Sequence, residues 1–159
     1  MVFRVLDSSA FYAGIPFSSN EPSYITSLIH NEIEHIKKDH DAVQILIETK
    51  RLMVHDPEHR FIIAVHDAAK KSGDFINLSE QDVSIIALSL QLKAELVTDD
   101  FAISNVAKNL SIKVAPVMTG GIQNVVIWKY YCPGCKTNFS KVSECPRCGN
   151  RLKRKPIKN

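Results

Sequence analysis

The four cysteines of the chain occur as two pairs whose spacing suits metal binding. Each C-x-x-C pair can turn tightly and point two thiolates at one ion, and nine residues separate the two pairs. Four sulfur ligands in a tetrahedral array form a closed, structural zinc site, so we expect one Zn²⁺. A thioredoxin-type redox motif needs a βαβ context and a single pair, and neither is found here. The expected zinc ligands are Cys132, Cys135, Cys145 and Cys148.

The segment that carries the cysteines is strongly basic. Residues 129–159 contain nine Lys+Arg against one Asp+Glu, a balance of +8, whereas residues 1–128 contain 11 against 16, a balance of −5. A zinc ion with four thiolates adds about −2. The remaining positive charge suits a polyanion such as RNA. The predicted RNA-binding residues are Lys129, Lys136, Lys141, Arg147, Arg151, Lys153, Arg154 and Lys155.

Aromatic residues are interleaved with these basic residues. Exposed rings beside cations could stack bases; in the alternative interpretation they form a small core and the basic tail is a solvated end. Thirty-one residues cannot bury a sufficient core, so zinc must supply much of the folding free energy of this ribbon. The aromatic residues are Trp128, Tyr130, Tyr131 and Phe139.

Acidic residues stand where parallel α/β sheets bind ligands. Asp7 ends a short apolar run, and Asp99 and Asp100 end another. Ligands of such sheets sit beyond the carboxyl ends of the strands. Asp82 lies at the opening of a predicted helix, and Glu32 lies in the middle of another, on a face that we expect to be partly buried. These five residues are the candidate catalytic residues.

Clustered carboxylates raise one another's pKa unless cations intervene, so such a cluster indicates Mg²⁺ or Mn²⁺. The implied reaction is metal-dependent phosphodiester hydrolysis. Each acid also has a purely structural interpretation. Asp7 could cap a helix, Asp82 could complete a capping box with Ser79, Asp99 and Asp100 could form a turn, and Glu32 could be a surface residue.

The elements that would position these acids alternate between strand and helix. Apolar runs at residues 3–6, 52–54, 96–97 and 112–115 predict strands, and helices are predicted at residues 8–13, 41–50, 61–71 and 103–110, with another after Ser79. An amphipathic helix is expected from Pro22 through Ile25 to Ile36. Short strands separated by helices predict an α/β domain with a parallel sheet covered on both faces. We place this domain at residues 1–122 and a zinc ribbon with a basic tail at residues 123–159.

Four motifs resemble the PIN-domain nucleases: VLDSSAF at residues 5–11, NEIE at 31–34, LSEQD at 78–82 and LVTDDFAISN at 96–105. The order of this domain before a C-x-x-C ribbon resembles the Nin-one-binding pre-rRNA endonucleases in their short, archaeal form. The resemblance implies a three-layer α/β/α fold. It also implies Mg²⁺ or Mn²⁺ ligands at Asp7, Glu32, Asp82 and one of Asp99 and Asp100, and the family's T-x-D pattern favours Asp100.

The resemblance further implies cleavage of precursor small-subunit rRNA at the mature 3′ end of 16S rRNA, with RNA and the small-subunit precursor as partners. A toxin-type PIN ribonuclease and a non-catalytic RNA-binding assembly factor are the alternatives. The chain has no run of 18 apolar residues and its N-terminus lacks the pattern of a signal peptide, so we expect a cytoplasmic protein with no membrane partner.

Overall fold

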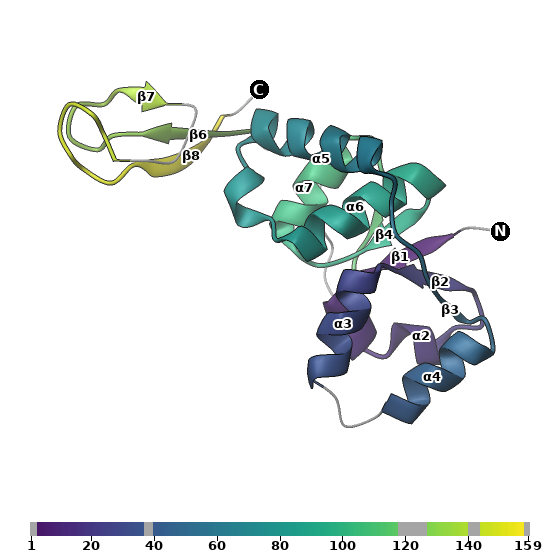
Figure 1. The fold of residues 1–159 in the computed structure, drawn as a ribbon. Helices are drawn as coiled ribbons and strands as arrows, with labels where there is room; N and C mark the ends of the chain where they lie inside the picture. The colour runs from purple at the N-terminus through teal and green to yellow at the C-terminus, as the bar shows by residue number, and fades with distance from the viewer. Residues whose placement is uncertain (1–2, 37–39, 118–126, 140–143, 158–159) are drawn as a thin grey trace.

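The computed structural model describes residues 3–36, 40–117, 127–139 and 144–157 (Figure 1). Its strands are β1 (Arg4–Leu6), β2 (Ser23–Ile25), β3 (Leu52–Val54), β4 (Glu95–Val97), β5 (Val114–Ala115), β6 (Ile127–Tyr131), β7 (Asn138–Phe139) and β8 (Lys153–Ile157). Its helices are α1 (Ser8–Tyr12), α2 (Ile15–Ser18), α3 (Ser27–Ile36), α4 (His40–Glu48), α5 (His59–Ser72), the 3-10 turn η1 (Phe75–Asn77), α6 (Glu80–Leu92) and α7 (Phe101–Asn109).

The first five strands form one parallel sheet in the order β3-β2-β1-β4-β5. The chain therefore builds outward from β1 in one direction to β3 and then crosses to β4 and β5 on the other side. Right-handed crossovers in opposite directions place their helices on opposite faces of a sheet. The expected α/β/α architecture with a parallel central sheet is confirmed, and the point where the strand order reverses lies between β1 and β4.

Helix α6 covers the middle of this sheet, where the strand order reverses between β1 and β4. We call this position the switch point. It contacts β1 and β4, and α5 and α7 pack beside it (Figure 1). Its residues from Val83 to Ser89 are all buried, and Val5, Leu6 and Leu96 of the central strands are buried with them. The ends of β1 and β4 are therefore held by fully buried residues of the hydrophobic core.

One expected helix begins later than its periodicity predicted. Ser23–Ile25 is not helical but forms strand β2, which pairs with β1 and β3. The helix α3 starts only at Ser27, where the Asp56 carboxylate accepts hydrogen bonds from the Ser27 N–H and hydroxyl, each at 2.9 Å. The prediction of a continuous helix from Pro22 was wrong because the pairing and the capping partners come from distant parts of the chain.

A second, antiparallel sheet in the order β7-β6-β8 contains the cysteine segment. Its small core consists of Tyr130, Cys132, Cys145 and Leu152, with Phe139 packed against them. Two of the aromatic side chains thus belong to the core of the ribbon. The basic tail is not a loose end, because residues 153–157 pair with β6 along its whole length.

Tyr130 also joins this ribbon to the first domain. Its ring is buried and its hydroxyl donates a 2.5 Å hydrogen bond to the Gly73 carbonyl, at the left-handed residue that ends α5. Burial, together with the Asp74 carboxylate, raises the pKa of Tyr130. The ribbon is therefore anchored to the end of α5 (Figure 1).

Within the described residues, no helix combines the length and the apolar character needed to cross a membrane.

Candidate acidic site and cysteine metal centre

Asp7 lies directly after β1 and is buried, with 5% of its surface exposed. One carboxylate oxygen accepts hydrogen bonds from the Ser9 hydroxyl at 2.6 Å and the Ala10 N–H at 2.8 Å. The other oxygen accepts a hydrogen bond from the Thr98 hydroxyl, which comes from the end of β4. Asp7 caps α1, as its structural interpretation predicted, and is also tied across the switch point to the neighbouring strand.

Asp100 and Asp99 follow β4 and play different parts in the fold. Asp100 caps α7, because its carboxylate accepts the Ile103 N–H at 3.0 Å, and its own N–H donates to the Thr98 hydroxyl at 3.1 Å. Asp99 instead accepts the Val117 N–H at 2.8 Å, beyond the end of β5. Thr98 therefore links Asp100 and Asp7 in one hydrogen-bond network. Asp99 is instead hydrogen-bonded on the side of β5, the edge strand of the sheet.

Asp82 lies in the first turn of α6 and forms a complete capping box with Ser79. The Ser79 N–H donates to its carboxylate at 2.9 Å, and its own N–H donates to the Ser79 hydroxyl at 3.1 Å. Burial raises the pKa of Asp82, the Ser79 hydrogen bonds oppose that shift, and the nearby carboxylates of Asp100 and Asp7 raise the pKa further. Asp7, Asp82 and Asp100 therefore lie within electrostatic reach of one another.

We expect Asp82→Asn to stabilise the metal-free protein. A raised pKa means that the folded state prefers the protonated carboxyl, so stability falls as pH rises through that pKa. Asparagine carries no charge and still accepts the Ser79 N–H. In EDTA at pH 7 the melting temperature should rise by less than the about 2–4 °C that ~1 kcal/mol gives a chain of this size, because solvent screens part of the charge of this half-exposed carboxyl.

The gain should shrink as the pH falls toward the ordinary range of an aspartate. The exposed Asp67→Asn is the matched control and should show no such pH-dependent gain. A lower melting temperature for Asp82→Asn at pH 7 would mean that its capping charge outweighs the repulsion.

Glu32 lies in the middle of α3 and is half-buried. Its carboxylate raises the pKa of Tyr12, after the larger effect of burial on that phenol. Tyr12 ends α1, the helix that Asp7 caps. Glu32 therefore faces the α1 side of the site, and helices α1 and α3 are in contact.

The acidic residues lie near one another, but their carboxylate oxygens are not as closely spaced as the ligands of a bound metal ion. Among the residues that the structure describes, the cysteines alone gather three or more potential ligand atoms as closely as a metal ion requires. Burial is the main cause of the raised pKa of Asp82, and the Asp100 and Asp7 carboxylates add smaller contributions in the same direction. Their donor set is made of carboxylate oxygens, the ligands that hard ions such as Mg²⁺ and Mn²⁺ prefer. The residues thus fit a divalent cation of this kind.

Two hydroxyl groups were not singled out as site residues by the sequence. Ser9 and Thr98 both donate to the Asp7 carboxylate, and Thr98 is fully buried. Thr98 stands two residues before Asp100, so its place in the T-x-D pattern was the available signal. Its partner across the sheet is 91 residues away in sequence, a separation that no local pattern reports.

The four cysteine thiols form the second candidate centre. Their sulfur atoms all lie within 4.8 Å of one another, and the Cys135 and Cys145 sulfurs are 3.6 Å apart. A tetrahedral site with metal–sulfur bonds of about 2.3 Å requires sulfur separations of about 3.8 Å. The cluster therefore has the geometry of a four-sulfur metal site.

The two knuckles approach each other closely at Gly134, where an added side chain would displace the Asn150 amide group. A Cβ on Gly134 would lie 2.7 Å from the Asn150 side-chain nitrogen.

The thiols of the cluster differ in pKa. Hydrogen bonds with the Thr137 hydroxyl and backbone lower the pKa of Cys135 to about 6, while the neighbouring thiols and burial raise the pKa of Cys148 to about 12. Four thiolates cannot coexist here without a cation to balance them, which is the electrostatic setting of a metal centre.

One face of the antiparallel strand pair β6 and β8 is basic. Lys129 pairs directly with Lys155, and Tyr131 pairs with Lys153. Alternate residues of a strand share a face, so these four side chains lie together, and the Lys155 ammonium sits 5.2 Å from the centre of the Tyr131 ring. We name these four residues the basic face. Like charges directly opposite each other destabilise a strand pair, a cost that a bound polyanion would remove.

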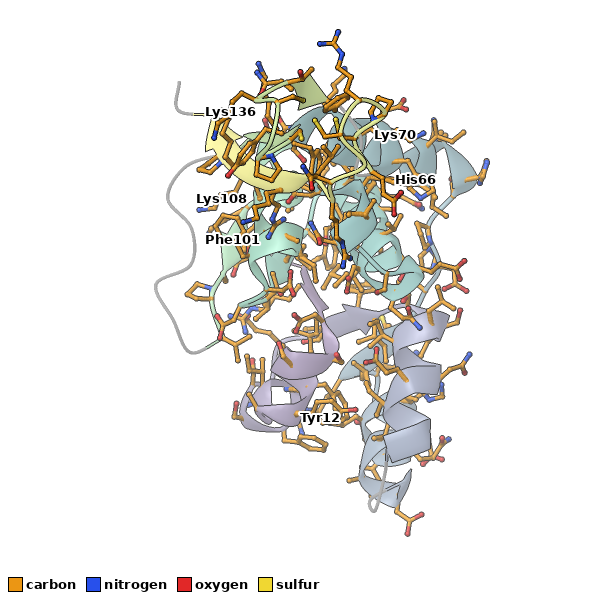
Figure 2. The ribbon with its side chains drawn as sticks, turned by 90° about the vertical axis from the view of Figure 1, so that its left-hand side faces the viewer. Tyr12, His66, Lys70, Phe101, Lys108 and Lys136 are labelled. Atoms are coloured by element: carbon orange, nitrogen blue, oxygen red, sulfur yellow. The ribbon has the colours of Figure 1, made fainter. Side chains whose placement is uncertain are left out.

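The other predicted RNA-binding residues are distributed around the ribbon. Lys136, Arg147, Arg151 and Arg154 are exposed, and Figure 2 shows Lys136 at the end of the molecule formed by the ribbon. Lys141 lies outside the described residues, and so does the side chain of Trp128. Lys136, Arg147 and Arg151 lie in or beside the knuckles, whereas Arg154 is in β8, on the face opposite the basic face.

Comparisons with known proteins agree with this architecture. A family model described as the PIN domain of ribonuclease matches residues 4–92. The Endoribonuclease Nob1 of Methanocaldococcus jannaschii is 37% identical over 163 residues, which cover 100% of this chain and 80% of that protein. The Endoribonuclease Nob1 of Pyrococcus abyssi is 34% identical, over 94% of this chain and 91% of its own length. The similarity therefore extends beyond the first domain.

A further relative matches a smaller part of the chain. The Ribonuclease VapC1 of Thermoplasma acidophilum is 37% identical over 123 residues, which cover 77% of this chain and 63% of that protein.

Proposed function

Because this chain belongs to the Nob1 endoribonucleases, a PIN-domain family, we propose that it cuts precursor small-subunit rRNA at the mature 3′ end of 16S rRNA in a metal-dependent reaction. The observation that carries the proposal is the match of a Nob1 endoribonuclease to 100% of this chain, basic ribbon included. The chain is an endoribonuclease that acts in rRNA processing, and the position of the cut is the part proposed here.

The residues proposed to hold the catalytic ion, Mg²⁺ or Mn²⁺, are Asp7, Glu32, Asp82 and Asp100. Such an ion supplies an activated water and neutralises charge on the phosphodiester. Thr98 and Ser9 fix the Asp7 carboxylate, and Thr98 also holds the backbone of Asp100. Asp99 is not assigned to the ion, because its carboxylate is held beyond the end of β5 by the Val117 N–H, whereas Asp100 is linked to Asp7 through the Thr98 hydroxyl.

The ribbon is proposed to hold the RNA, as a unit distinct from the nuclease domain at residues 1–122. An acidic site repels a polyanion, so the substrate must gain its affinity elsewhere. Lys129, Lys153 and Lys155 of the basic face lie on one side of the strand pair around Tyr131, an arrangement suited to phosphates and one stacked base. The small-subunit precursor is the proposed source of this RNA.

Zinc is the ion proposed for the cysteine cluster. Four thiolates select soft or borderline ions, and zinc accepts the tetrahedral arrangement that the sulfur separations allow. The role is structural, because four protein ligands leave no open position for a substrate. Among the residues that the structure describes, this group of potential ligands contains the four cysteines and no acidic residue.

A toxin-type ribonuclease is the second candidate, since the Ribonuclease VapC1 of Thermoplasma acidophilum is 37% identical over 123 residues, 77% of this chain. Such an enzyme would have the same acidic residues, but its activity would not account for the basic face. A non-catalytic assembly factor is the third candidate. The three differ in what they cut: one site, many RNAs or none.

The deciding experiment maps RNA ends after incubation with the purified protein. The substrates are an RNA that spans the mature 3′ end of 16S rRNA, the same RNA with that junction moved by 20 nucleotides, and an unrelated messenger RNA. Each is incubated with Mn²⁺, Mg²⁺ or EDTA. A single metal-dependent cut that follows the junction supports the proposal, general cutting supports the toxin-type candidate, and binding without any cut supports the assembly factor.

Asp100→Asn and Asp99→Asn form a matched pair in the same assay. Asparagine at position 100 still caps α7, so we expect an intact fold and a cleavage rate at least ~100-fold lower, the effect of losing a few kcal/mol of transition-state stabilisation. Asp99→Asn should stay within about threefold of the wild-type rate. The opposite pattern would assign the fourth acidic ligand to Asp99.

A further inference from the structure

Two exposed aromatic rings stand on a buried third one beside the acidic site. Tyr12 is 50% exposed and Phe17 is 45% exposed, whereas Phe11 is only 6% exposed. The Phe11 ring centre lies 6.2 Å from that of Tyr12 and 5.7 Å from that of Phe17, edge-on to both. We name these three residues the aromatic shelf. Large aromatic surface left in water is the kind of surface that binds a partner.

The shelf is held in place before any ligand arrives. Gly14 turns the chain between α1 and α2 with a φ of +83°, and Pro16 stands in the first turn of α2. The Arg51 guanidinium, from the start of β3, donates to the carbonyls of Pro16 at 3.3 Å, Phe17 at 3.4 Å and Ser19 at 2.7 Å. A ligand that stacks on these rings therefore pays little for ordering the segment.

The shelf adjoins the acids that would perform the reaction. Asp7 caps α1 and Tyr12 ends it, so at 1.5 Å per residue the two are separated by about 7–8 Å along the helix axis. The Glu32 carboxylate acts on the Tyr12 phenol from the α3 side. Tyr12 thus stands on the helix that Asp7 caps and within electrostatic reach of Glu32, and Phe17 is connected to it through the ring of Phe11.

Charge decides which part of a nucleotide this surface can take. Residues 5–36, which run from the second residue of β1 to the end of α3, contain no Lys or Arg, and Arg4 just before them forms an ion pair with Glu21 at 3.0 Å. The Arg51 guanidinium reaches this segment but donates to the backbone carbonyls of Pro16, Phe17 and Ser19. A phosphate would meet carboxylates without a counter-charge here, whereas the uncharged face of a base meets an aromatic ring.

We propose that Tyr12 and Phe17 stack the unpaired bases of the RNA next to the phosphate that is cut. This rests on the proposed function, because it names how the same site holds its substrate. The bases provide a contact that does not depend on charge, at the part of the molecule where charge repels the substrate. Figure 2 shows Tyr12 far from Lys136 of the ribbon, so the shelf is a second RNA contact, separate from the basic ribbon.

The test measures binding without cleavage. All variants are made in the full-length Asp7→Asn protein with Mg²⁺ present, and the probe is a single-stranded RNA with 2-aminopurine on either side of the expected cut. Stacking on an aromatic ring quenches the fluorescence of 2-aminopurine. Tyr12→Ala and Phe17→Ala should each weaken binding by about five- to a hundredfold, the range for one lost base–aromatic stack, and should restore the fluorescence.

Two further variants separate stacking from general damage. Tyr12→Phe keeps the ring and should bind within about twofold of the parent. Phe3→Ala removes another exposed ring, 39% exposed and packed edge-on against Tyr24 at the amino end of β1, and should change neither affinity nor fluorescence.

Unchanged binding and quenching in both Tyr12→Ala and Phe17→Ala would overturn the stacking proposal while leaving the nuclease assignment intact. Conversely, a failure to cut at the 16S junction would leave the binding measurement valid, since the probe reports on stacking alone. Equal loss in Phe3→Ala would mean that the effect is not specific to the shelf and would also overturn it.

Discussion

Asp7→Asn should lower the rate of RNA cleavage by at least ~10³-fold, because loss of a carboxylate ligand to the catalytic ion removes several kcal/mol of transition-state stabilisation. The fold should survive. Asparagine is as good an N-cap as aspartate, and its side-chain oxygen can still accept the Ala10 N–H that Asp7 accepts at 2.8 Å. Its amide group can donate to the Thr98 hydroxyl, which then acts as the acceptor.

The effect should appear in the rate and not in RNA binding. Asp7 is buried and carries a charge that repels the substrate, so its neutralisation should leave the dissociation constant for RNA unchanged or slightly lower. Single-turnover cleavage and fluorescence anisotropy measure the two quantities separately. Asp41→Asn, on the exposed side of α4, is the control and should cut at the wild-type rate. An Asp7→Asn protein that keeps more than a tenth of the activity would remove Asp7 from the metal site.

Removal of the metal from the cysteine cluster should unfold the ribbon and leave the first domain folded. The hydrophobic cluster of the ribbon is small: four buried residues, two of them cysteines. Such a core cannot offset the chain entropy of the segment, whereas structural zinc contributes on the order of 10 kcal/mol at pH 7. Cys145→Ser should have the same result, since Cys145 is both a proposed zinc ligand and a core residue.

The measurement is an amide NMR spectrum recorded before and after chelation, together with RNA binding at several salt concentrations. Signals from residues 129–157 should collapse to the positions of an unfolded chain, while those of the parallel sheet stay. Affinity should fall at least about tenfold, and the salt slope should drop by about 2 as three lysines of the basic face lose their phosphates. Lys113→Ala, in the first domain, should change neither quantity by a comparable amount. A ribbon that stays folded after chelation would contradict the assignment of a structural metal.

The features that the sequence predicted well are those specified within a few residues. The two C-x-x-C knuckles are local turns, and each is closed by its own backbone hydrogen bonds, such as Lys136 N–H to the Cys132 carbonyl and Gly149 N–H to the Cys145 carbonyl. The corner at Asp7 is equally local, because the strand, the cap and α1 follow one another directly. The class of fold followed from the alternation of such short elements.

The features that the sequence did not predict depend on distant partners. Strand β2 has three residues, too few to reveal the alternation of a strand, and Ile25 fits the helical spacing of the residues that follow. The burial of Tyr130 depends on Gly73, 57 residues earlier in the chain. Likewise, Arg51 reaches α2 across 32–35 residues. Periodicity and motifs describe what a residue can do, but they do not report where such contacts form.

The hydrogen bond between Tyr130 and Gly73 also limits how the ribbon could be transplanted. A graft of residues 127–157 onto another nuclease would carry the cysteines and the basic face, but the carbonyl that receives the tyrosine hydroxyl would stay behind at the end of α5. In such a chimera the ribbon would be joined to the nuclease, but its orientation would not be fixed. A functional transfer would therefore need the ribbon together with a helix that ends in a left-handed glycine. The hydrogen bond between that helix and the ribbon would fix the direction in which the ribbon faces the RNA.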